Sequence, residues 1–517
     1  MKQNLSFEEY KDKVYACWLG KNIGGSLGGP FECKRGVWEL SDYTADLTKG
    51  PLPNDDLDLQ LVWLNAAEAY GTSVNSEILG EYWLSYITPH WSEYGTAKNN
   101  MANGIQPPYS GMYHNHNKDS CGAFIRSELW ACLAPGHPQI AVKYAFEDAI
   151  CDHADEGLYA EIFCAAVESA AFIENDTGKL IETGLAYIPS DCAIAKVVLA
   201  AQECYKNGLS WKEARIKILQ DFPCSFGMYS GYEDRTPEPE VPAGRLGFDA
   251  PANIGITIIG WLYGEGDFGK SICIAAGCGE DSDCTAATLG SILGIAGGTS
   301  ALPEKWTKPL GNKIVTISIS STDTGITIPQ TIDQLSERVC RLMPVFIGND
   351  FDFLNTENMS ISCPSGLADT PEKLGVYARR NFRQWLSVRS SGIARSNPLL
   401  EAVVSVENGI HIEEGSEKQI KIHLYNKQDQ PLWLTLRWIM PDDWTASPGR
   451  SSQVFLEQYH GGCRITDVSH VLIPQELKNS RYDIILEITA NSRLSHLYIP
   501  ITLFSGRDTI HCESYNL

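Results

Sequence analysis

The pattern of apolar residues changes once along this chain, and that change limits the folds the chain can adopt. Up to about residue 345, apolar residues recur at helical spacing over long stretches. After about residue 395 they occur in short alternating or β-branched runs between turn residues. We therefore predict a multidomain protein, with an all-α domain over residues 1–345, a connector with one helix over 346–395 and a β-sandwich over 396–517.

The same patterns place the individual elements. Helices are expected over 14–27, 57–70, 140–150, 159–172, 192–206, 211–219, 254–262, 285–295, 332–342 and, in the connector, 371–386. Strands are expected over 400–405, 419–425, 432–439, 468–473, 482–488 and 495–503, with strand-like alternation also at 313–328. Long loops rich in Gly, Pro and Asn are expected at 97–122 and 222–252, and loops of that length are usually functional.

The charge balance argues against two classes of partner. Lys and Arg total 41 against 64 Asp and Glu, which gives a net charge of −23. Such a field repels nucleic-acid phosphates and anionic lipid, so we expect neither nucleic acid nor a membrane as the main partner. No stretch approaches the ~18 uninterrupted apolar residues of a membrane span, and the N-terminus lacks a secretory pattern. The sixteen cysteines form no C-x-x-C pair, which favours reduced, buried thiols and a cytoplasmic protein.

Acidic residues crowd the starts of two apolar helices. Residues 54–56 (Asn-Asp-Asp) precede the first, and residues 279–285 (Gly-Glu-Asp-Ser-Asp-Cys-Thr) open the second. Either cluster alone is explained by a helix N-cap. Together they can bring four carboxylates to one point, where they cannot all stay ionised without cations. Carboxylate oxygens suit hard divalent ions, and a pair of such ions can hold and activate a water.

At these positions the sequence resembles the ADP-ribosylglycohydrolase family. Residues 20–32 (GKNIGGSLGGPFE) are similar to the family's opening G-x-x-x-G-x-x-x-G…E motif, 54–56 to its Thr-Asp-Asp motif and 281–284 to its Asp-x-Asp-Ser/Thr motif. Further similar segments are Gly122-Ala123 with Arg126, Asp152-His153-Ala154, 286–294, and Gly298 with Pro303 and Trp306. The resemblance covers about residues 10–345, with the motifs in the family's order.

The resemblance implies an all-helical fold with a binuclear site for Mg²⁺ or Mn²⁺, and hydrolysis at the anomeric carbon of an ADP-ribose unit. The implied metal positions are Asn54, Asp55, Asp56, Asp281, Asp283 and Cys284. Asn54 and Cys284 stand where the family usually has hydroxyl ligands. Glu32 stands where some members have a carboxylate that acts at the metals. We expect the ions to grip vicinal ribose hydroxyls and a water whose proton goes to Glu32 or to a ligand aspartate, Asp55 or Asp56.

The resemblance also suggests which residues bind the ribosyl substrate, which is a small molecule or a group linked to a protein. The expected substrate-binding residues are Glu32, Asp119, Gly122, Arg126 and His153. For Arg126, pairing with a carboxylate inside the protein is the favoured alternative to contact with a substrate phosphate. For His153, a helix cap or a supporting hydrogen bond is favoured over direct ligation.

Two departures from the family pattern leave other functions open. The glycine-rich diphosphate loop of some members is reduced here to residues 120–123 (Ser-Cys-Gly-Ala). One alternative is therefore a glycosidase or nucleosidase acting on a furanoside without diphosphate, and another is a non-catalytic member that only binds a ligand. Cys284 offers a soft thiol where relatives have an oxygen, and we expect its sulfur to stay outside the coordination sphere.

Two further patterns have simple interpretations. Residues 24–28 match the G-x-S-x-G nucleophile elbow, but an elbow needs a preceding strand, and 14–19 has a helical pattern. Glycines four residues apart on a helix instead predict close helix packing. In the β-region, residues 439–448 resemble a strand-turn of immunoglobulin-like modules found beside glycosidase domains. The tryptophans there are expected to be mostly core, with a sugar-binding platform as the alternative: Trp433, Trp438 and Trp444.

Overall fold

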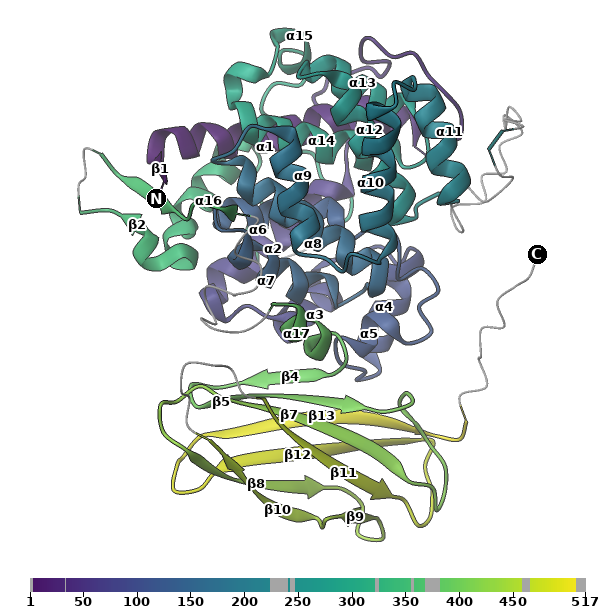
Figure 1. Ribbon diagram of the computed structural model, residues 1–517, viewed down its shortest axis with the longest axis vertical. Coiled ribbons are helices and arrows are strands. Elements are labelled where there is room, and N and C mark those ends of the chain that lie inside the picture. Colours follow the sequence, from purple (N-terminus) through teal and green to yellow (C-terminus); the bar gives the residue numbers. More distant parts are fainter. Residues whose placement is uncertain are drawn as a thin grey trace. The chain divides into compact units, whose positions relative to one another are not determined.

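The computed structural model describes most of the chain as two compact units (Figure 1). The described residues are 3–32, 34–223, 240–241, 247–320, 325–354, 358–367, 382–457 and 465–507. The first unit comprises residues 1–95 and 115–371, and the second comprises 96–114 and 372–517. The predicted domain boundaries lie at 345 and 395, so the units also assign the segment 96–114 to the β-rich part of the chain.

Helices make up most of the first unit, as predicted. In chain order the helices are α1 (Phe7–Gly28), α2 (Asp55–Tyr70), α3 (Ser76–Tyr86), α4 (Ser92–Ala102), α5 (Tyr109–Met112), α6 (Glu128–Leu133), α7 (Pro138–Ala149), α8 (Asp155–Ala171), α9 (Thr177–Ala186), α10 (Ala193–Lys206), α11 (Trp211–Asp221), α12 (Ala250–Gly264), α13 (Phe268–Gly277), α14 (Ser282–Gly297), α15 (Glu304–Thr307), α16 (Ile332–Ile347) and α17 (Phe382–Arg389). Of these, α5 and α17 belong to the second unit, and α4 crosses the division between the units.

The closest helix contact in the first unit joins α1 to α14 (Figure 1). A Cβ placed on Gly24 would lie 2.1 Å from the carbonyl oxygen of Ala286, so the two backbones touch. Gly20 meets Gly290 and Gly28 meets Ser282 in the same way, at 2.1 and 2.2 Å. The glycines spaced four apart therefore serve helix packing, as the sequence predicts. Because the helices run antiparallel, the end of α1 lies against the start of α14.

The first unit also contains a small three-stranded sheet. Strands β1 (Gln3–Ser6) and β2 (Phe351–Asp352) both pair with β3 (Ser360–Cys363), in the order β1-β3-β2. All pairings are antiparallel, and Leu5 of β1 lies opposite Ile361. The sequence pattern missed this sheet because its strands are four residues or shorter, too short to show alternation.

The second unit is a sandwich of two five-stranded sheets. Its strands are β4 (Ile393–Ser396), β5 (Leu400–Val406), β6 (His411–Ile412), β7 (Lys418–Asn426), β8 (Leu432–Ile439), β9 (Thr445–Ser447), β10 (Ser451–Leu456), β11 (Ile465–Ile473), β12 (Arg481–Ala490) and β13 (His496–Ser505). One sheet has the order β10-β8-β12-β13-β6 and the other β4-β5-β7-β11-β9. Alternate residues of β8, such as Leu434 and Leu436, are fully buried in the shared core.

The segment 96–114 completes the core of this second unit. Ile105 and Tyr109 are buried in the same cluster as the sandwich strands. The Tyr109 hydroxyl accepts a hydrogen bond of 2.7 Å from the backbone N–H of Val406. Among the tryptophans, Trp438 and Trp444 are core residues as expected, whereas Trp433 is 56% exposed and lies against Phe455.

Several expectations about loops and strands were wrong. Residues 313–328 form no strand in their described part, where isolated bridges occur at Lys313 and Ile319. The segment 97–122 is not one long loop, because α4 continues to Ala102 and α5 follows. Most of the predicted loop 222–252, and most of the predicted connector helix 371–386, lie outside the described residues, and α17 continues to Arg389.

The contact between α1 and α14 gives a sharp stability test. In an open helix, Gly→Ala stabilises by about 1 kcal/mol. At Gly24 the added methyl would overlap the backbone of Ala286, so we expect Gly24→Ala to destabilise the protein by about 1–3 kcal/mol. Gly29→Ala is the matched control, because its methyl would meet only a leucine side-chain carbon at 3.4 Å. Thermal unfolding of both variants measures the difference, and an unchanged Gly24→Ala midpoint would contradict the close contact.

A buried lysine predicts how the second unit responds to pH. Burial lowers the pKa of Lys418 to about 8. Between pH 8 and the pKa of a lysine in the unfolded chain, the unfolded state binds more protons than the folded state. The free energy of unfolding should therefore rise with pH over this range. Lys418→Met should stabilise the unit by about 1–2 kcal/mol at pH 7 and by much less at pH 10. Urea unfolding at both pH values tests this, and a pH-independent difference would contradict it.

Candidate metal centre

The start of α2 carries the first acidic cluster. Asn54 is the N-cap of this helix, and its side-chain oxygen accepts a hydrogen bond of 2.8 Å from the backbone N–H of Asp56. The structure thus gives Asn54 the capping role that the tripeptide alone suggests. Asp55 remains partly accessible, whereas Asp56 is 1% exposed.

The start of α14 carries the second cluster. Asp281 is the N-cap residue, and Asp283 lies in the first turn; both are buried. The backbone N–H of Asp281 donates to the side-chain oxygen of Asn253 at 3.2 Å, which ties this turn to α12. A carboxylate in the first turn of a helix also interacts favourably with the helix dipole.

The fold brings the two clusters together. The Cys284 thiol donates to the Asp56 carboxylate across the two helices, at 3.4 Å between Sγ and Oδ1. Ligand atoms of Asp281, Asp283 and Cys284 all lie within 4.8 Å of one another. The predicted convergence of 54–56 with 281–284 is therefore present in the structure.

The electrostatics of the cluster show how crowded it is. Burial, then the neighbouring Asp283 carboxylate, raises the pKa of Asp55 to about 7. Burial and Asp283 also raise the pKa of Asp281 well above its usual range, and the nearby Glu32 contributes in the same direction. The pKa of Asp56 is raised as well, mainly by burial, against the lowering effect of Lys21. Without a cation these groups therefore resist ionising together.

The donor set fits hard divalent cations. Three buried carboxylate oxygens accept no hydrogen bond: Asp56 Oδ2, Asp281 Oδ1 and Asp283 Oδ1. Leaving a buried acceptor without a partner costs about 1–3 kcal/mol, and more if it is charged. Mg²⁺ and Mn²⁺ are bound through oxygens of this kind. Asp55, Asp56, Asp281 and Asp283 are thus suited to hold such ions.

Behind Asp56 lies a buried cation that the sequence analysis missed as part of the site. The Lys21 ammonium is 4.0 Å from Asp56 Oδ2 and donates to Glu128 at 2.7 Å. Gln60 also donates to Glu128 at 2.8 Å and links α2 to α6. Lys21 lies inside the predicted 20–32 motif, but a single lysine in a glycine-rich helix gives no signal of its position in space.

A second buried network is centred on Arg126 and His153. Arg126 is fully buried and donates to both Asp148 and Asp152, at 2.8 and 2.6 Å for the shortest contacts. His153 is also fully buried and lies 2.7 Å from the Ser120 hydroxyl and 3.0 Å from Asp152. The favoured structural pairing of Arg126 is thus present. Both side chains act within the protein here, because neither has a surface that a substrate can reach directly.

Glu93 is a carboxylate of this site that sequence reasoning missed. It is 7% exposed, and its Oε1 lies 3.9 Å from His153 Nε2. Its charge contributes to the raised pKa of Asp55, after the effects of burial, Asp283 and Asp58. Glu93 lies in a polar Ser-Glu-Tyr segment at the start of α4, and such a glutamate is normally exposed to solvent. Nothing in the sequence therefore indicated that Glu93 is buried.

The other predicted substrate residues have mainly structural contacts. Asp119 accepts a hydrogen bond of 3.0 Å from the backbone N–H of Glu156 and thereby supports the start of α8. Gly122 is buried, and a Cβ there would lie 2.5 Å from Glu93 Oε1, so a glycine makes room for that carboxylate. Glu32 is exposed at the end of a short 3₁₀ turn, Gly29–Phe31, that follows α1. Its position near Asp281 agrees with the predicted role of a carboxylate at the metals.

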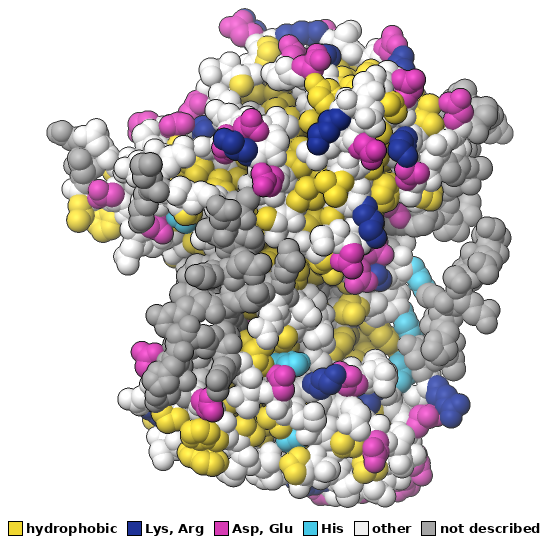
Figure 2. Space-filling view, viewed as in Figure 1, with side chains coloured by type: hydrophobic (Ala, Val, Ile, Leu, Met, Phe, Trp, Pro, Cys, Tyr) yellow, Lys and Arg dark blue, Asp and Glu magenta, His cyan; other side chains and the backbone are white. Residues whose placement is uncertain are grey.

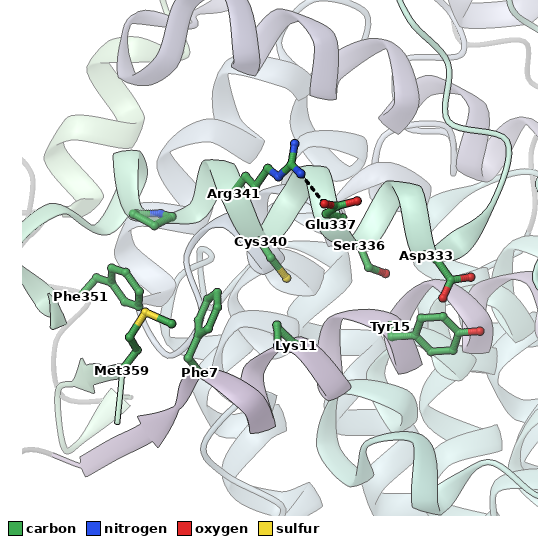
Figure 3. A pocket seen from close by; sticks show the side chains of 11 residues that line it. Phe7, Lys11, Tyr15, Asp333, Ser336, Glu337, Cys340, Arg341, Phe351 and Met359 are labelled. Carbon is green, nitrogen blue, oxygen red and sulfur yellow. Dashed lines mark hydrogen bonds and ion pairs between the residues drawn. The ribbon is translucent and has the colours of Figure 1, made fainter. Parts of the chain in front are cut away.

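A separate surface cavity lies between α1 and α16 (Figure 3). Its volume is about 510 Å³, and Phe7, Tyr15, Cys340 and Phe351 contribute to its lining. It lies along the first half of α1, whereas the acidic cluster lies against the second half of that helix, where Lys21 approaches Asp56 and Gly28 meets Ser282. None of the predicted site residues lines this cavity, so it is distinct from the candidate metal centre.

The first unit is an α-helical domain with a cluster of buried aspartates at the starts of two helices. The chain belongs to the ADP-ribosylglycohydrolase family, whose model matches residues 6–345. Members of this family are metal-dependent, which agrees with the acidic cluster. No curated protein matches the chain.

Three solved structures are similar to this chain at low sequence identity and low TM-score. A FixG-related protein from Vibrio parahaemolyticus is 14% identical with a TM-score of 0.17, covering 22% of this chain and 100% of that one. The GAE domain of GGA2p from Saccharomyces cerevisiae is 13% identical with a TM-score of 0.15, covering 22% and 96%. The alkylpurine DNA glycosylase AlkC from Pseudomonas fluorescens is 11% identical with a TM-score of 0.13, covering 87% and 99%.

The position of Cys284 leads to a prediction about metal preference. Burial, followed by the three neighbouring aspartates, raises the pKa of this thiol well above its usual value, so it stays protonated and donates to Asp56. We expect Cys284→Ser to bind Mn²⁺ within about threefold of the parent, because a serine hydroxyl preserves the donor. Calorimetric titration with Mn²⁺ and Zn²⁺ measures this. Zn²⁺ binding that is strong in the parent and lost in the variant would show that the sulfur is a ligand.

Proposed function

We propose that this protein is a metal-dependent glycohydrolase that cleaves a glycosidic bond at the anomeric carbon of a ribosyl group. The proposal rests on its family and, above all, on one observation: within the acidic cluster, the buried oxygens Asp56 Oδ2, Asp281 Oδ1 and Asp283 Oδ1 have no hydrogen-bond partner. Two divalent ions, Mg²⁺ or Mn²⁺, held by Asp55, Asp56, Asp281 and Asp283 would satisfy these oxygens. When bound, such ions supply charge that activates water and orients vicinal hydroxyls.

The surrounding residues have separate tasks in this proposal. Lys21 orients the Asp56 carboxylate from inside the protein, and the buried Arg126 holds Asp148 and Asp152 in place. Glu32 is the only exposed carboxylate among the predicted catalytic residues, so it is placed to accept the proton of the attacking water. An oxocarbenium-like centre then develops at the anomeric carbon as the leaving group departs.

A second substrate class is favoured by a specific observation. The segment 120–123, which stands where some relatives bind diphosphate, is buried, and the Arg126 guanidinium next to it is fully paired. It therefore offers no accessible cation to a diphosphate. This favours a ribosyl or other furanosyl substrate without diphosphate over ADP-ribose. Comparing hydrolysis of an ADP-ribosylated peptide with that of a simple β-furanosyl substrate distinguishes the two.

The surface agrees with a small-molecule or protein-linked substrate. On the face shown in Figure 2, Lys and Arg side chains lie interspersed with Asp and Glu side chains. A nucleic-acid partner normally requires a concentrated basic surface. No helix among the described residues is long and apolar enough to cross a membrane.

The metal ligands can be tested with an isosteric change. Asp283→Asn removes the charge but keeps the size, so we expect metal affinity to fall at least tenfold and turnover to fall below about 1% of the parent. The rise in melting temperature on adding Mn²⁺ should shrink in parallel. Metal analysis, calorimetry and thermal unfolding measure these three effects.

Glu147→Gln is the matched control for this experiment. Glu147 is 4% exposed in the same unit, and its carboxylate accepts a 3.0 Å hydrogen bond from the backbone N–H of Ser76, away from the acidic cluster. We expect its loss to lower stability without changing metal affinity. Normal metal content and turnover in Asp283→Asn would refute the proposed site.

A further inference from the structure

We propose that Arg35 and Glu280 form a positioning pair that fixes the Glu32 loop against the turn carrying Asp281. The inference rests on the proposed function, because it concerns how that site is held together. Neither residue is among the ligands or catalytic residues assigned above. The pair is formed by residues 245 positions apart in the sequence.

The contact itself is bidentate and shielded from water. Arg35 Nε donates to Glu280 Oε1 at 2.7 Å, and Arg35 Nη2 donates to Oε2 at 3.1 Å. Glu280 is fully buried, and the Arg35 side chain is 12% exposed. Two parallel charge-assisted hydrogen bonds fix orientation as well as distance. A buried carboxylate paired in this way is costly to leave without its cation.

The backbone at Glu280 needs such support. Gly279 and Glu280 have φ values of +74° and +64°, so two successive residues lie in the left-handed region. Gly279 is favourable there, but a residue with a side chain pays about 1–2 kcal/mol for this conformation. Because Asp281 follows directly, the direction of the candidate ligand depends on this turn. The surrounding contacts therefore have to maintain an unfavourable backbone at a functional position.

Three elements meet on the Glu280 residue. Its carboxylate accepts a third hydrogen bond, 2.8 Å long, from the backbone N–H of Gly247. Its own backbone N–H donates to the carbonyl oxygen of Lys34 at 3.3 Å, in an isolated antiparallel bridge. A Cβ on Gly279 would lie 2.6 Å from that same Lys34 oxygen, so the backbones of the two segments are in contact.

The other end of the pair leads to Glu32. Arg35 follows Glu32 by three residues, so its attachment limits where the exposed Glu32 carboxylate can lie. Trp38 anchors the same loop from its far side, since its backbone N–H donates to the Gly277 carbonyl at 2.9 Å. The pair thus sets the distance between the proposed proton acceptor and a proposed ligand.

The test uses Arg35→Met in the full-length chain, with Mn²⁺ alone as the probe. We expect at least a tenfold loss of Mn²⁺ affinity by calorimetry, while the helical circular dichroism spectrum is retained. Arg35→Lys keeps the charge but cannot make the two parallel guanidinium hydrogen bonds, so its Mn²⁺ affinity should lie between those of the parent and Arg35→Met. Glu280→Gln provides a second approach if Arg35→Met does not fold, and the same loss of affinity is expected.

Arg338→Met is the matched control. Arg338 makes a bidentate pair with Glu68 at 2.9 and 2.6 Å and is 18% exposed, but it lies on α16, away from the acidic cluster. The Arg338→Met substitution should lower the melting temperature without altering Mn²⁺ affinity. Unchanged affinity in both Arg35→Met and Glu280→Gln, or an equal loss in Arg338→Met, would overturn the inference.

The outcomes separate this inference from the proposed function. If the parent binds no divalent ion, the proposed function fails, and hydrogen exchange of residues 279–283 then tests the pair alone. Faster exchange there in Arg35→Met than in Arg338→Met supports the positioning role, and equal exchange overturns it. If the parent binds Mn²⁺ and both variants of the pair bind it equally well, only the positioning role fails.

Discussion

The candidate site depends on the backbone contact between α1 and α14. Glycines at three successive four-residue steps let the two helices approach until their backbones touch. Since the helices are antiparallel, Gly28 at the end of α1 meets Ser282 at the start of α14. Glu32, four residues after Gly28, and Asp281 therefore lie near one another although they are far apart in the sequence. A single methyl between the helices would displace the loop after α1 from the acidic cluster.

Repulsion among the carboxylates is the second constraint. Packing alone would favour apolar residues at two helix starts that face each other, and here the chain places four aspartates. Burial raises their pKa values, and one oxygen each of Asp56, Asp281 and Asp283 accepts no hydrogen bond. Such an arrangement costs stability, as functional sites commonly do, and a divalent cation reverses the cost. Lys21, 4.0 Å from Asp56 Oδ2, offsets part of the negative charge from inside the protein.

The sequence was most informative where a pattern was long or chemically unusual. The expected helix 57–70 became α2, and the expected strand 432–439 coincides with β8, because both carry strong periodicity. The carboxylates of 54–56 and 281–283 were recognisable by type and position at helix starts. Glu93, Glu280 and Lys21 were not, because their roles come from distant contacts that leave no local pattern. The strands β1 to β3 were missed because each has four residues or fewer, too few to show alternation.

The assignment of residues 96–114 to the second unit has a consequence for the order of folding. Ile105 and Tyr109 belong to the core of the sandwich, yet almost 300 residues of other sequence are synthesised before the first sandwich strand. Until then these side chains lack their final packing partners. The second unit therefore cannot mature as an autonomous C-terminal module on the ribosome. Its completion has to wait for both separated parts of the chain, as in a protein with an inserted domain.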